Sequence, residues 1–169
     1  MSFPTVTLEL PDWVEKLVPD PDRAYPTEED RMRLAVELSR LNAERGTGGP
    51  FGAAIFERET DKLRSPGMNL VVPPSCSVAH AEMVAIKVAQ RVVGDFDLVG
   101  RGKPAYELYA STEPCAMCFG ATPWSGVRRL VCGARDEDAR AVGFDEGAKL
   151  PDWPSALDER GIYNARLGD

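Results

Sequence analysis

Hydrophobic residues recur at helical spacing in two parts of the chain, and each part predicts a helix. Between positions 32 and 41 an apolar residue returns every three or four positions, which predicts a helix over residues 27–45. Thr27 is a suitable N-cap, acidic residues fill the turn after it, and Gly46 stops the helix. Residues 79–93 are apolar on nearly every side, so this second helix is predicted to be buried.

Four short apolar segments have the composition of β-strands. They cover residues 52–57, 63–71, 106–112 and 128–134. A short helix is predicted after each of the last two, one with Pro114 near its first position and one over residues 136–142. This order of elements predicts an α/β domain in which helices lie on both sides of a mixed sheet. The last two strands, each followed by a helix, are predicted to be parallel neighbours.

The two ends of the chain lack such patterns. Residues 1–26 are rich in proline and predict an N-terminal extension with a short helix near "PDWVEKL", whereas residues 27–169 predict a single domain. Beyond Gly143 prolines and glycines recur, and the chain is predicted to be a loop.

Composition narrows the class of partner. Hydrophobic residues make up 43% of the 169 positions, enough for a sizeable core, and no apolar run has the length of a membrane span. The net charge of -7 and the absence of a Lys/Arg cluster argue against a long nucleic acid and favour a small-molecule partner. The N-terminus has no basic segment followed by an apolar one, so a cytoplasmic protein is expected.

Cys115 and Cys118 are candidates for a redox or metal site. The pair alone fits a redox site, half of a structural zinc knuckle, or half of a catalytic metal site. The single histidine, His80, opens the buried helix, and both helix starts are expected at one edge of the sheet. Together His80, Cys115 and Cys118 make a plausible zinc set with one open position. Cys76 and Cys132, in apolar or small-residue surroundings, are expected to be buried thiols.

Glu82 decides between these alternatives. Two steps along a helix correspond to about 200° of rotation, so Glu82 is not expected to point with His80 toward the metal. It is expected to face a bound water molecule and the substrate, first as general base and then as general acid. As a lone residue it would be an ordinary acid in a first helical turn. The combination H-x-E and P-C-x-x-C is instead typical of zinc-dependent base deaminases.

At "HAEMVAIKVAQ" and "TEPCAMCFGA" the chain resembles the cytidine deaminase superfamily, over about residues 28–150. It is most similar to the bacterial guanine deaminase branch, which includes members that act on ammeline-like triazines. Three further stretches carry this likeness: "GGPFGAAIFE", "GMNLV" with Asn69, and "GFDEG" with Glu146.

The resemblance implies a three-layer α/β/α fold with a mixed sheet of about five strands, a Zn2+ cofactor and a homodimer. It implies hydrolytic deamination of guanine to xanthine and ammonia, with Glu82 and Glu146 as catalytic residues. The implied substrate contacts are Phe51, Asn69, Ala81, Trp124 and Tyr163. The alternatives are a deaminase of tRNA adenosine, cytosine or a triazine, or a non-catalytic module stabilised by zinc.

One feature of the family is not visible in the sequence. Its members usually continue into a fifth strand and a C-terminal helix, but no such pattern follows residue 143. By resemblance, Tyr163 would be the aromatic residue of a C-terminal tail that covers a pocket, sometimes that of the partner subunit.

Overall fold

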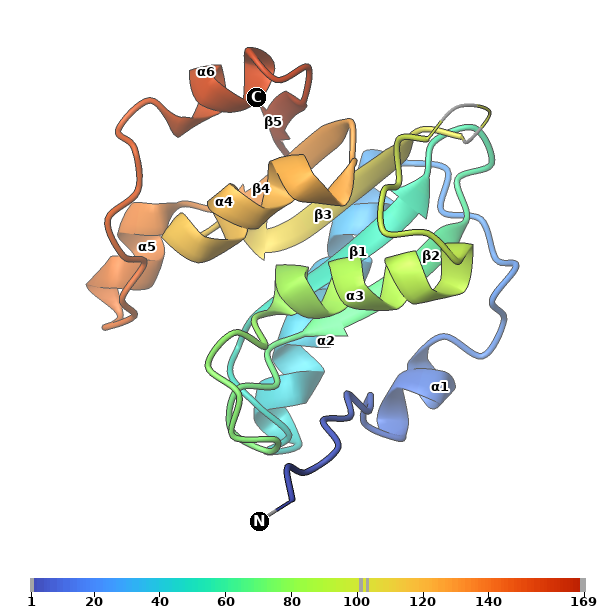
Figure 1. The fold of residues 1–169 in the computed structure, drawn as a ribbon, viewed down its shortest axis with the longest axis vertical. Helices are drawn as coiled ribbons and strands as arrows, with labels where there is room; N and C mark the ends of the chain where they lie inside the picture. The colour runs from blue at the N-terminus through green and yellow to red at the C-terminus, as the bar shows by residue number, and fades with distance from the viewer. Residues whose placement is uncertain (1, 101, 103, 168–169) are drawn as a thin grey trace.

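A five-stranded mixed sheet forms the centre of the structure, a computed structural model that describes residues 2–100, 102 and 104–167 (Figure 1). The strands are β1 (Gly52–Glu57), β2 (Leu63–Met68), β3 (Tyr106–Thr112), β4 (Arg129–Ala134) and β5 (Tyr163–Arg166). Their order across the sheet is β2-β1-β3-β4-β5. β1 pairs antiparallel with β2 and β3, whereas β3, β4 and β5 are parallel. The predicted mixed sheet, with parallel β3 and β4, is thus confirmed.

Helices cover both faces of this sheet (Figure 1). They are α1 (Trp13–Leu17), α2 (Glu28–Glu44), α3 (Ala81–Val93), α4 (Ala116–Ser125), α5 (Asp136–Ala141) and α6 (Trp153–Asp158). α2 lies on one face, and α3 and α4 lie on the other. The three-layer α/β/α architecture is therefore confirmed. None of these helices is long and apolar enough to cross a membrane.

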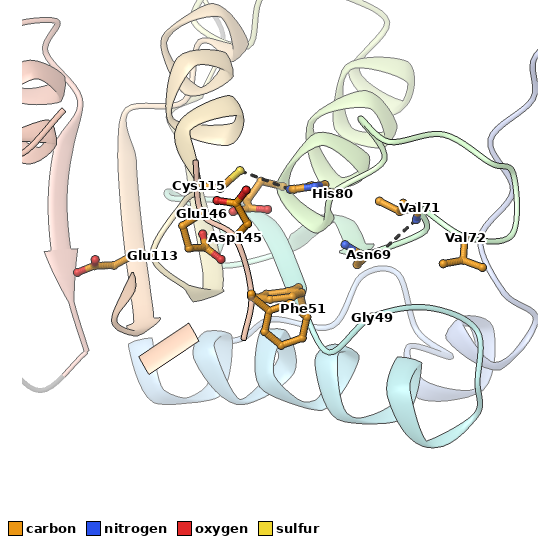
Figure 2. Close-up of a pocket in the computed structure, with 12 residues that line it drawn as sticks. Gly49, Phe51, Asn69, Val71, Val72, His80, Glu113, Cys115, Asp145 and Glu146 are labelled. Atoms are coloured by element: carbon orange, nitrogen blue, oxygen red, sulfur yellow. Dashed lines mark hydrogen bonds between the residues drawn. The ribbon is translucent and has the colours of Figure 1, made fainter. Parts of the chain in front are cut away.

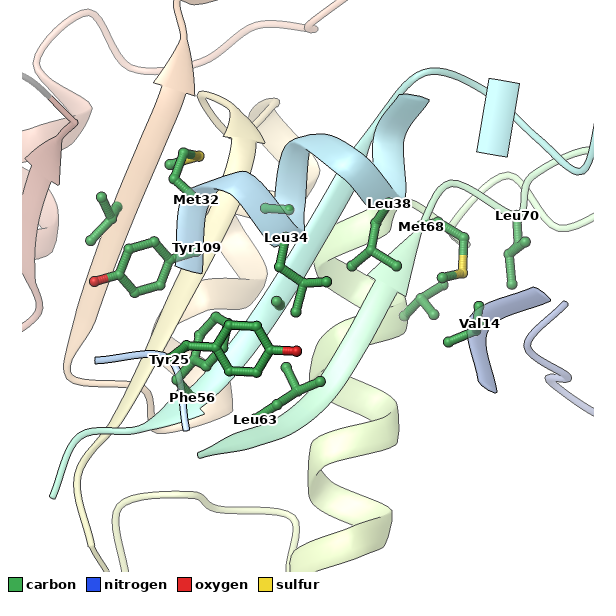
Figure 3. Close-up of a cluster of buried hydrophobic side chains, with 14 of the residues drawn as sticks. Val14, Tyr25, Met32, Leu34, Leu38, Phe56, Leu63, Met68, Leu70 and Tyr109 are labelled. Carbon is green, nitrogen blue, oxygen red and sulfur yellow. The ribbon is translucent and has the colours of Figure 1, made fainter. Parts of the chain in front are cut away.

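The central strands are buried on both faces, which explains their nearly continuous apolar sequences. Because successive side chains of a strand point to opposite faces, Phe56 and Tyr109 face α2 (Figure 3), whereas Ile55 and Leu108 face α3. Two hydrophobic clusters result, one on each side of the sheet. The sheet between them is therefore a rigid support for the residues at the ends of its strands.

The helix boundaries agree closely with the sequence pattern. Thr27 is the N-cap of α2, and its hydroxyl accepts a hydrogen bond from the Asp30 amide at 3.1 Å. Gly46 follows the helix with a φ of 65°, a conformation that favours glycine. β2 is shorter than predicted and ends at Met68. That end leaves Asn69 in the turn beyond the strand.

The prediction of a loop beyond Gly143 is wrong. α6 and β5 lie in this segment, and β5 pairs in parallel register with β4 from Arg129 to Cys132. β5 has only four residues, and α6 has six with a proline in its first turn. Neither is long enough to show a periodicity in sequence, so these elements depend on tertiary contacts. The fifth strand of the family is therefore present, and among the described residues the helix of this segment precedes that strand and does not follow it.

The N-terminal segment packs against the rest of the structure. Trp13 and Val14 of α1, together with Tyr25, are buried in the same hydrophobic cluster as α2. The Trp13 indole N–H also donates to the Thr47 hydroxyl at 3.1 Å. Residues 13–25 thus contribute to the core on the α2 side of the sheet.

A buried arginine ties α2 to the sheet. Arg31 is 6% exposed; its Nε donates to the Tyr25 carbonyl and its Nη1 to Glu107 Oε2, both at 2.8 Å. It also pairs with Asp61. Removing one member of a buried ion pair leaves the other without its counter-charge, which costs about 3–5 kcal/mol.

We therefore expect Arg31→Met to lower the free energy of unfolding by about 3 kcal/mol or more, measured by urea denaturation. Arg33→Met is the matched control, because Arg33 lies on the same helix with a side chain 74% exposed. The control should change stability by less than about 0.5 kcal/mol. Equal losses in the two variants would contradict a special role for the buried pair.

Candidate active site

The N-terminal ends of α3 and α4 meet at the edge of the sheet where β3 ends. His80 is the N-cap of α3, and Cys115 is the N-cap of α4. The structure corrects one detail here, because Pro114 lies before the N-cap and not in the first helical turn. Gly67 in β2 allows α3 to sit directly on the sheet. A Cβ atom at this position would lie 2.3 Å from the Ala81 carbonyl oxygen.

Three predicted ligands converge at these helix ends. The Cys115 and Cys118 sulfurs lie 3.4 and 3.7 Å from His80 Nδ1, and all three ligand atoms lie within 4.8 Å of one another. No fourth ligand from the described residues joins this group. Two sulfurs and one imidazole suit zinc, and three protein ligands leave a position for water, as in catalytic zinc sites. The arrangement favours a catalytic metal site over a redox pair or a four-ligand structural knuckle.

The surroundings of Cys115 favour a thiolate. A hydrogen bond from the Cys118 thiol, followed by one from His80, lowers the pKa of Cys115 to about 4. A sulfur that is already deprotonated is ready to bind a divalent cation.

Glu82 lies beside the ligands in the first turn of α3. It is 7% exposed, and its Oε2 lies 3.3 Å from the Cys118 sulfur. Burial is the main cause that raises the pKa of Glu82 above the usual range of a carboxyl group. A raised pKa favours the protonated form of the carboxyl group, which suits a group that takes up a proton and later returns it.

A cavity of about 280 Å³ opens next to these groups (Figure 2). Its described lining residues are Gly49, Phe51, Asn69, Val71, Val72, His80, Glu82, Glu113, Cys115, Phe144, Asp145 and Glu146. The structure therefore brings four residues named from the sequence, Phe51, Asn69, Glu82 and Glu146, into one cavity with two of the ligands. A volume of this size suits a small molecule.

Apolar and amide groups face each other across the cavity. The Phe51 and Phe144 rings meet edge to face, with centroids 4.7 Å apart. The Asn69 Oδ1 accepts a hydrogen bond from the Val71 amide at 3.2 Å. Its side-chain nitrogen lies on the side of Glu146 and Cys115 (Figure 2). Asn69 can thus donate a hydrogen bond into the cavity.

Glu146 reaches the cavity from the loop after α5. It is 5% exposed, and burial is the main cause that raises its pKa to about 7. Its carbonyl oxygen accepts a hydrogen bond from the Ala116 amide at 2.9 Å. Lys149 holds the same loop in place, because its Nζ donates to the Pro114 carbonyl at 2.8 Å. The loop is thereby fixed to the start of α4.

Three residues expected at the substrate do not line the cavity. Trp124, at the far end of α4, is 81% exposed, so the expectation that it walls the cavity is not met within one subunit. Tyr163 begins β5, at the edge of the sheet opposite the site, and Arg129 lies over its ring. Ala81 is the first residue of α3 and is buried in the core.

The other two cysteines lie outside the ligand group. Cys132 is 1% exposed within the core, and burial raises its thiol pKa. Cys76 is partly buried and packs against the hydrophobic cluster on the α2 side of the sheet. The expected buried thiol is thus found at Cys132, whereas Cys76 is only partly buried, and neither belongs to the ligand group.

Sequence reasoning missed several cavity residues. Phe144 and Asp145 lie in the "GFDEG" stretch beside Glu146, and Glu113 directly precedes the P-C-x-x-C motif, so neighbouring motifs could have pointed to them. Val71 and Val72 carry no such signal, because they enter the cavity only through the turn that follows β2.

Comparison with protein families shows which family the chain belongs to. The model described as the cytidine and deoxycytidylate deaminase zinc-binding region matches residues 26–134. The chain belongs to this family. Zinc is therefore the cofactor that the ligand group is built to bind, as predicted.

Individual relatives add detail to this assignment. Guanine deaminase of Bacillus subtilis is 34% identical over 131 residues, which cover 78% of this chain and 80% of the relative. A solved structure of guanine deaminase from Nitrosomonas europaea is 44% identical, with a TM-score of 0.90 and coverage of 96% of this chain and 88% of that one.

A further solved structure holds a nucleobase analogue. The protein NE0047, in complex with 2,6-diaminopurine, is 45% identical, with a TM-score of 0.91 and coverage of 96% of this chain and 85% of that one. The fold is thus shared over nearly the whole length of the chain.

Removing one ligand should release the metal. We expect Cys118→Ser to lose most of its zinc and to melt at a lower temperature, because a bound ligand stabilises only the folded state. Zinc content by mass spectrometry and thermal unfolding measure the two effects. Cys132→Ala, which removes a buried sulfur outside the group, is the control and should keep its zinc. The reverse pattern would contradict the assigned ligand set.

Proposed function

We propose that this protein catalyses the hydrolytic deamination of guanine to xanthine and ammonia, and that it also accepts ammeline-like triazines. The observation that carries the proposal is the position of Glu82, a buried carboxyl group that lines the same cavity as the zinc ligands. The similarity to two guanine deaminases over most of the chain supports guanine as the base.

Zinc held by His80, Cys115 and Cys118 would supply a Lewis acid that lowers the pKa of a coordinated water molecule. Glu82 lies next to this set and accepts the proton of the attacking water. Its raised pKa lets it keep that proton and pass it to a ring nitrogen of the base. The same side chain therefore serves as base and then as acid.

Glu146 is suited to the second proton transfer. Its pKa of about 7 means that both the acid and the carboxylate are populated at neutral pH. We propose that it protonates the departing amine as the C–N bond breaks, and that it regains a proton from the hydroxyl group on the same carbon as this group becomes the carbonyl; its loop is fixed to the start of α4 by the hydrogen bond from Ala116. Two carboxyl groups serve two protonation sites, since the ring nitrogen and the leaving amine each need a proton.

The walls of the cavity favour a neutral, planar ligand. Phe51 and Phe144 provide apolar surface for a base, and the Asn69 amide provides a hydrogen-bond donor for its edge. None of the described lining residues is a lysine or an arginine, whereas Glu113 and Asp145 add carboxylates. A phosphorylated substrate would be repelled here, so we propose the free base as substrate and no long nucleic acid as partner.

The proposal also includes a homodimer in the cytoplasm. The exposed aromatic rings of Trp124 and Tyr163 are surfaces that a partner subunit could cover. All four cysteines are free thiols, which suits a reducing compartment.

A substrate panel tests the proposal directly. Ammonia release is measured with guanine, ammeline, cytosine, adenine and their nucleosides, and guanine should give the highest kcat/KM. Preference for adenosine or cytosine would instead assign another deaminase activity. If no substrate releases ammonia although zinc is bound, the result would favour a non-catalytic module.

Glu82→Gln should abolish turnover and keep zinc, because the amide fits the site but cannot accept a proton. We expect kcat to fall by at least about 10²-fold, within the usual range for a general acid–base. Steady-state ammonia release and zinc content measure the two properties. A variant that deaminates guanine at nearly the wild-type rate would remove Glu82 from the mechanism.

Glu146→Gln should lower kcat by about 10²-fold if Glu146 transfers the second proton. Glu137→Gln is the control, because Glu137 is an exposed acid on α5 that pairs with Arg135. It should retain wild-type kcat. A Glu146 variant with unchanged kcat and a raised KM would assign this residue to binding alone.

A further inference from the structure

A fully buried polar side chain lies behind the cavity wall and takes no part in the proposed chemistry. Asn42, near the end of α2, is 0% exposed. Its Nδ2 donates to the Gly49 carbonyl at 2.9 Å and to the Asn69 carbonyl at 2.8 Å. Its Oδ1 accepts a hydrogen bond from the Thr47 hydroxyl at 2.7 Å. Both amide hydrogens and the oxygen therefore have partners.

The orientation of this amide is set from the N-terminal segment. The Thr47 hydroxyl accepts the Trp13 indole N–H at 3.1 Å, which leaves its single hydrogen for Asn42, where Oδ1 at 2.7 Å is nearer than the main-chain carbonyl at 3.3 Å. With its oxygen held by Thr47, the Asn42 amide must turn its NH₂ group toward the two carbonyls. A chain of hydrogen bonds thus runs from α1 to the back of the cavity.

The two carbonyls belong to residues that line the cavity, Gly49 and Asn69. The Asn69 amide N–H donates to the Phe51 carbonyl at 3.0 Å, so the Asn69 backbone is held on both sides. Gly48 packs directly against this peptide, because a Cβ atom at position 48 would lie 1.9 Å from the Asn69 carbonyl oxygen. Any tilt of this peptide would move the Asn69 side chain that faces the cavity.

We propose that Asn42 is a positioning residue for substrate binding, and that Thr47 and Trp13 extend its support into α1. It fixes the Asn69 backbone, and thereby the side-chain amide of Asn69 at the edge of the cavity where a base would donate or accept hydrogen bonds. The inference rests on the proposed function. It gives the N-terminal helix a role in recognition in addition to its packing.

The groups that carry the chemistry are held by other contacts. Glu82 belongs to α3, and Glu146 belongs to the loop fixed to α4 by Ala116 and Lys149. Disturbing Asn42 should therefore weaken binding of the base and leave the proton transfers in place. In kinetic terms, KM rises and kcat is retained.

Thr47→Val is the sharpest test, because it removes the hydroxyl with little change in volume. We expect KM for guanine to rise about tenfold, the size of one lost hydrogen bond to the substrate, with kcat within about twofold and zinc content unchanged.

Two further variants grade the effect. Asn42→Asp, which turns a carboxylate toward two carbonyls, should raise KM further. Trp13→Phe leaves the bond between Thr47 and Asn42 and should raise KM by only about two- to threefold.

Ser65→Ala is the matched control for a merely structural effect. Ser65 is buried in β2, and its hydroxyl donates to the Ala85 carbonyl at 2.7 Å, away from the cavity. This variant should melt at a lower temperature and keep its KM. If Thr47→Val matches that loss of Tm and also keeps its KM, the positioning role is overturned.

Failure of the proposed function gives a different result. Wild-type protein that releases no ammonia from guanine contradicts the function, whichever variant is compared. The positioning role is then decided by titrating 2,6-diaminopurine into each zinc-loaded protein by calorimetry. A Kd about tenfold weaker in Thr47→Val than in wild type and Ser65→Ala supports the role, and equal Kd values in all three overturn it.

Discussion

The concentration of acidic groups at one buried edge of the sheet is the constraint on which the rest of the structure depends. Cys115, Cys118, Glu82 and Glu146 lie together there, and among the described lining residues no lysine or arginine balances them. Bringing such groups out of water is costly unless a cation or shared protons compensate. A divalent cation meets that need at the sulfurs, and the raised pKa values of the two glutamates meet it at the carboxyl groups. Burying these acidic groups is costly, but the same burial raises the pKa values of the two glutamates and so suits them to proton transfer.

The fold holds this edge by supports of two kinds. A sheet buried on both faces carries the starts of α3 and α4, so His80 and Cys115 have fixed positions. Loops supply the remaining walls, and single polar side chains hold those loops: Lys149 at the Pro114 carbonyl, and Asn42 at the Asn69 carbonyl. Such hydrogen bonds satisfy backbone groups that would otherwise be buried without partners. Rigid elements therefore carry the metal ligands and Glu82, the proposed general base, whereas braced loops carry most of the remaining cavity wall.

Much of the fold was predictable, because long periodic segments specify their own structure. The apolar spacing of α2 and the cap at Thr27 placed that helix correctly. The uninterrupted apolar strands placed the centre of the sheet. The segment after Gly143 was not predictable, because β5 and α6 are too short to repeat a pattern and form only against β4 and the core. Trp124 is close to the motif in sequence but lies on the surface of the subunit, so proximity in sequence does not place an aromatic ring in the cavity.

The sequence by itself determined the reaction centre. Cys115 and Cys118 are one helix turn apart, His80 and Glu82 open another helix, and the combined H-x-E and P-C-x-x-C pattern was sufficient to predict the ligand set and the carboxyl group beside it. Only the tertiary structure decided which other groups face the substrate. Asn69 and Phe144 reach the cavity from turns whose paths depend on distant contacts, and Asn42 acts through carbonyls, which every residue has and no sequence pattern marks. The difference is physical: ligand chemistry resides in particular side chains, whereas the shape of a cavity resides in how backbones from separate elements meet.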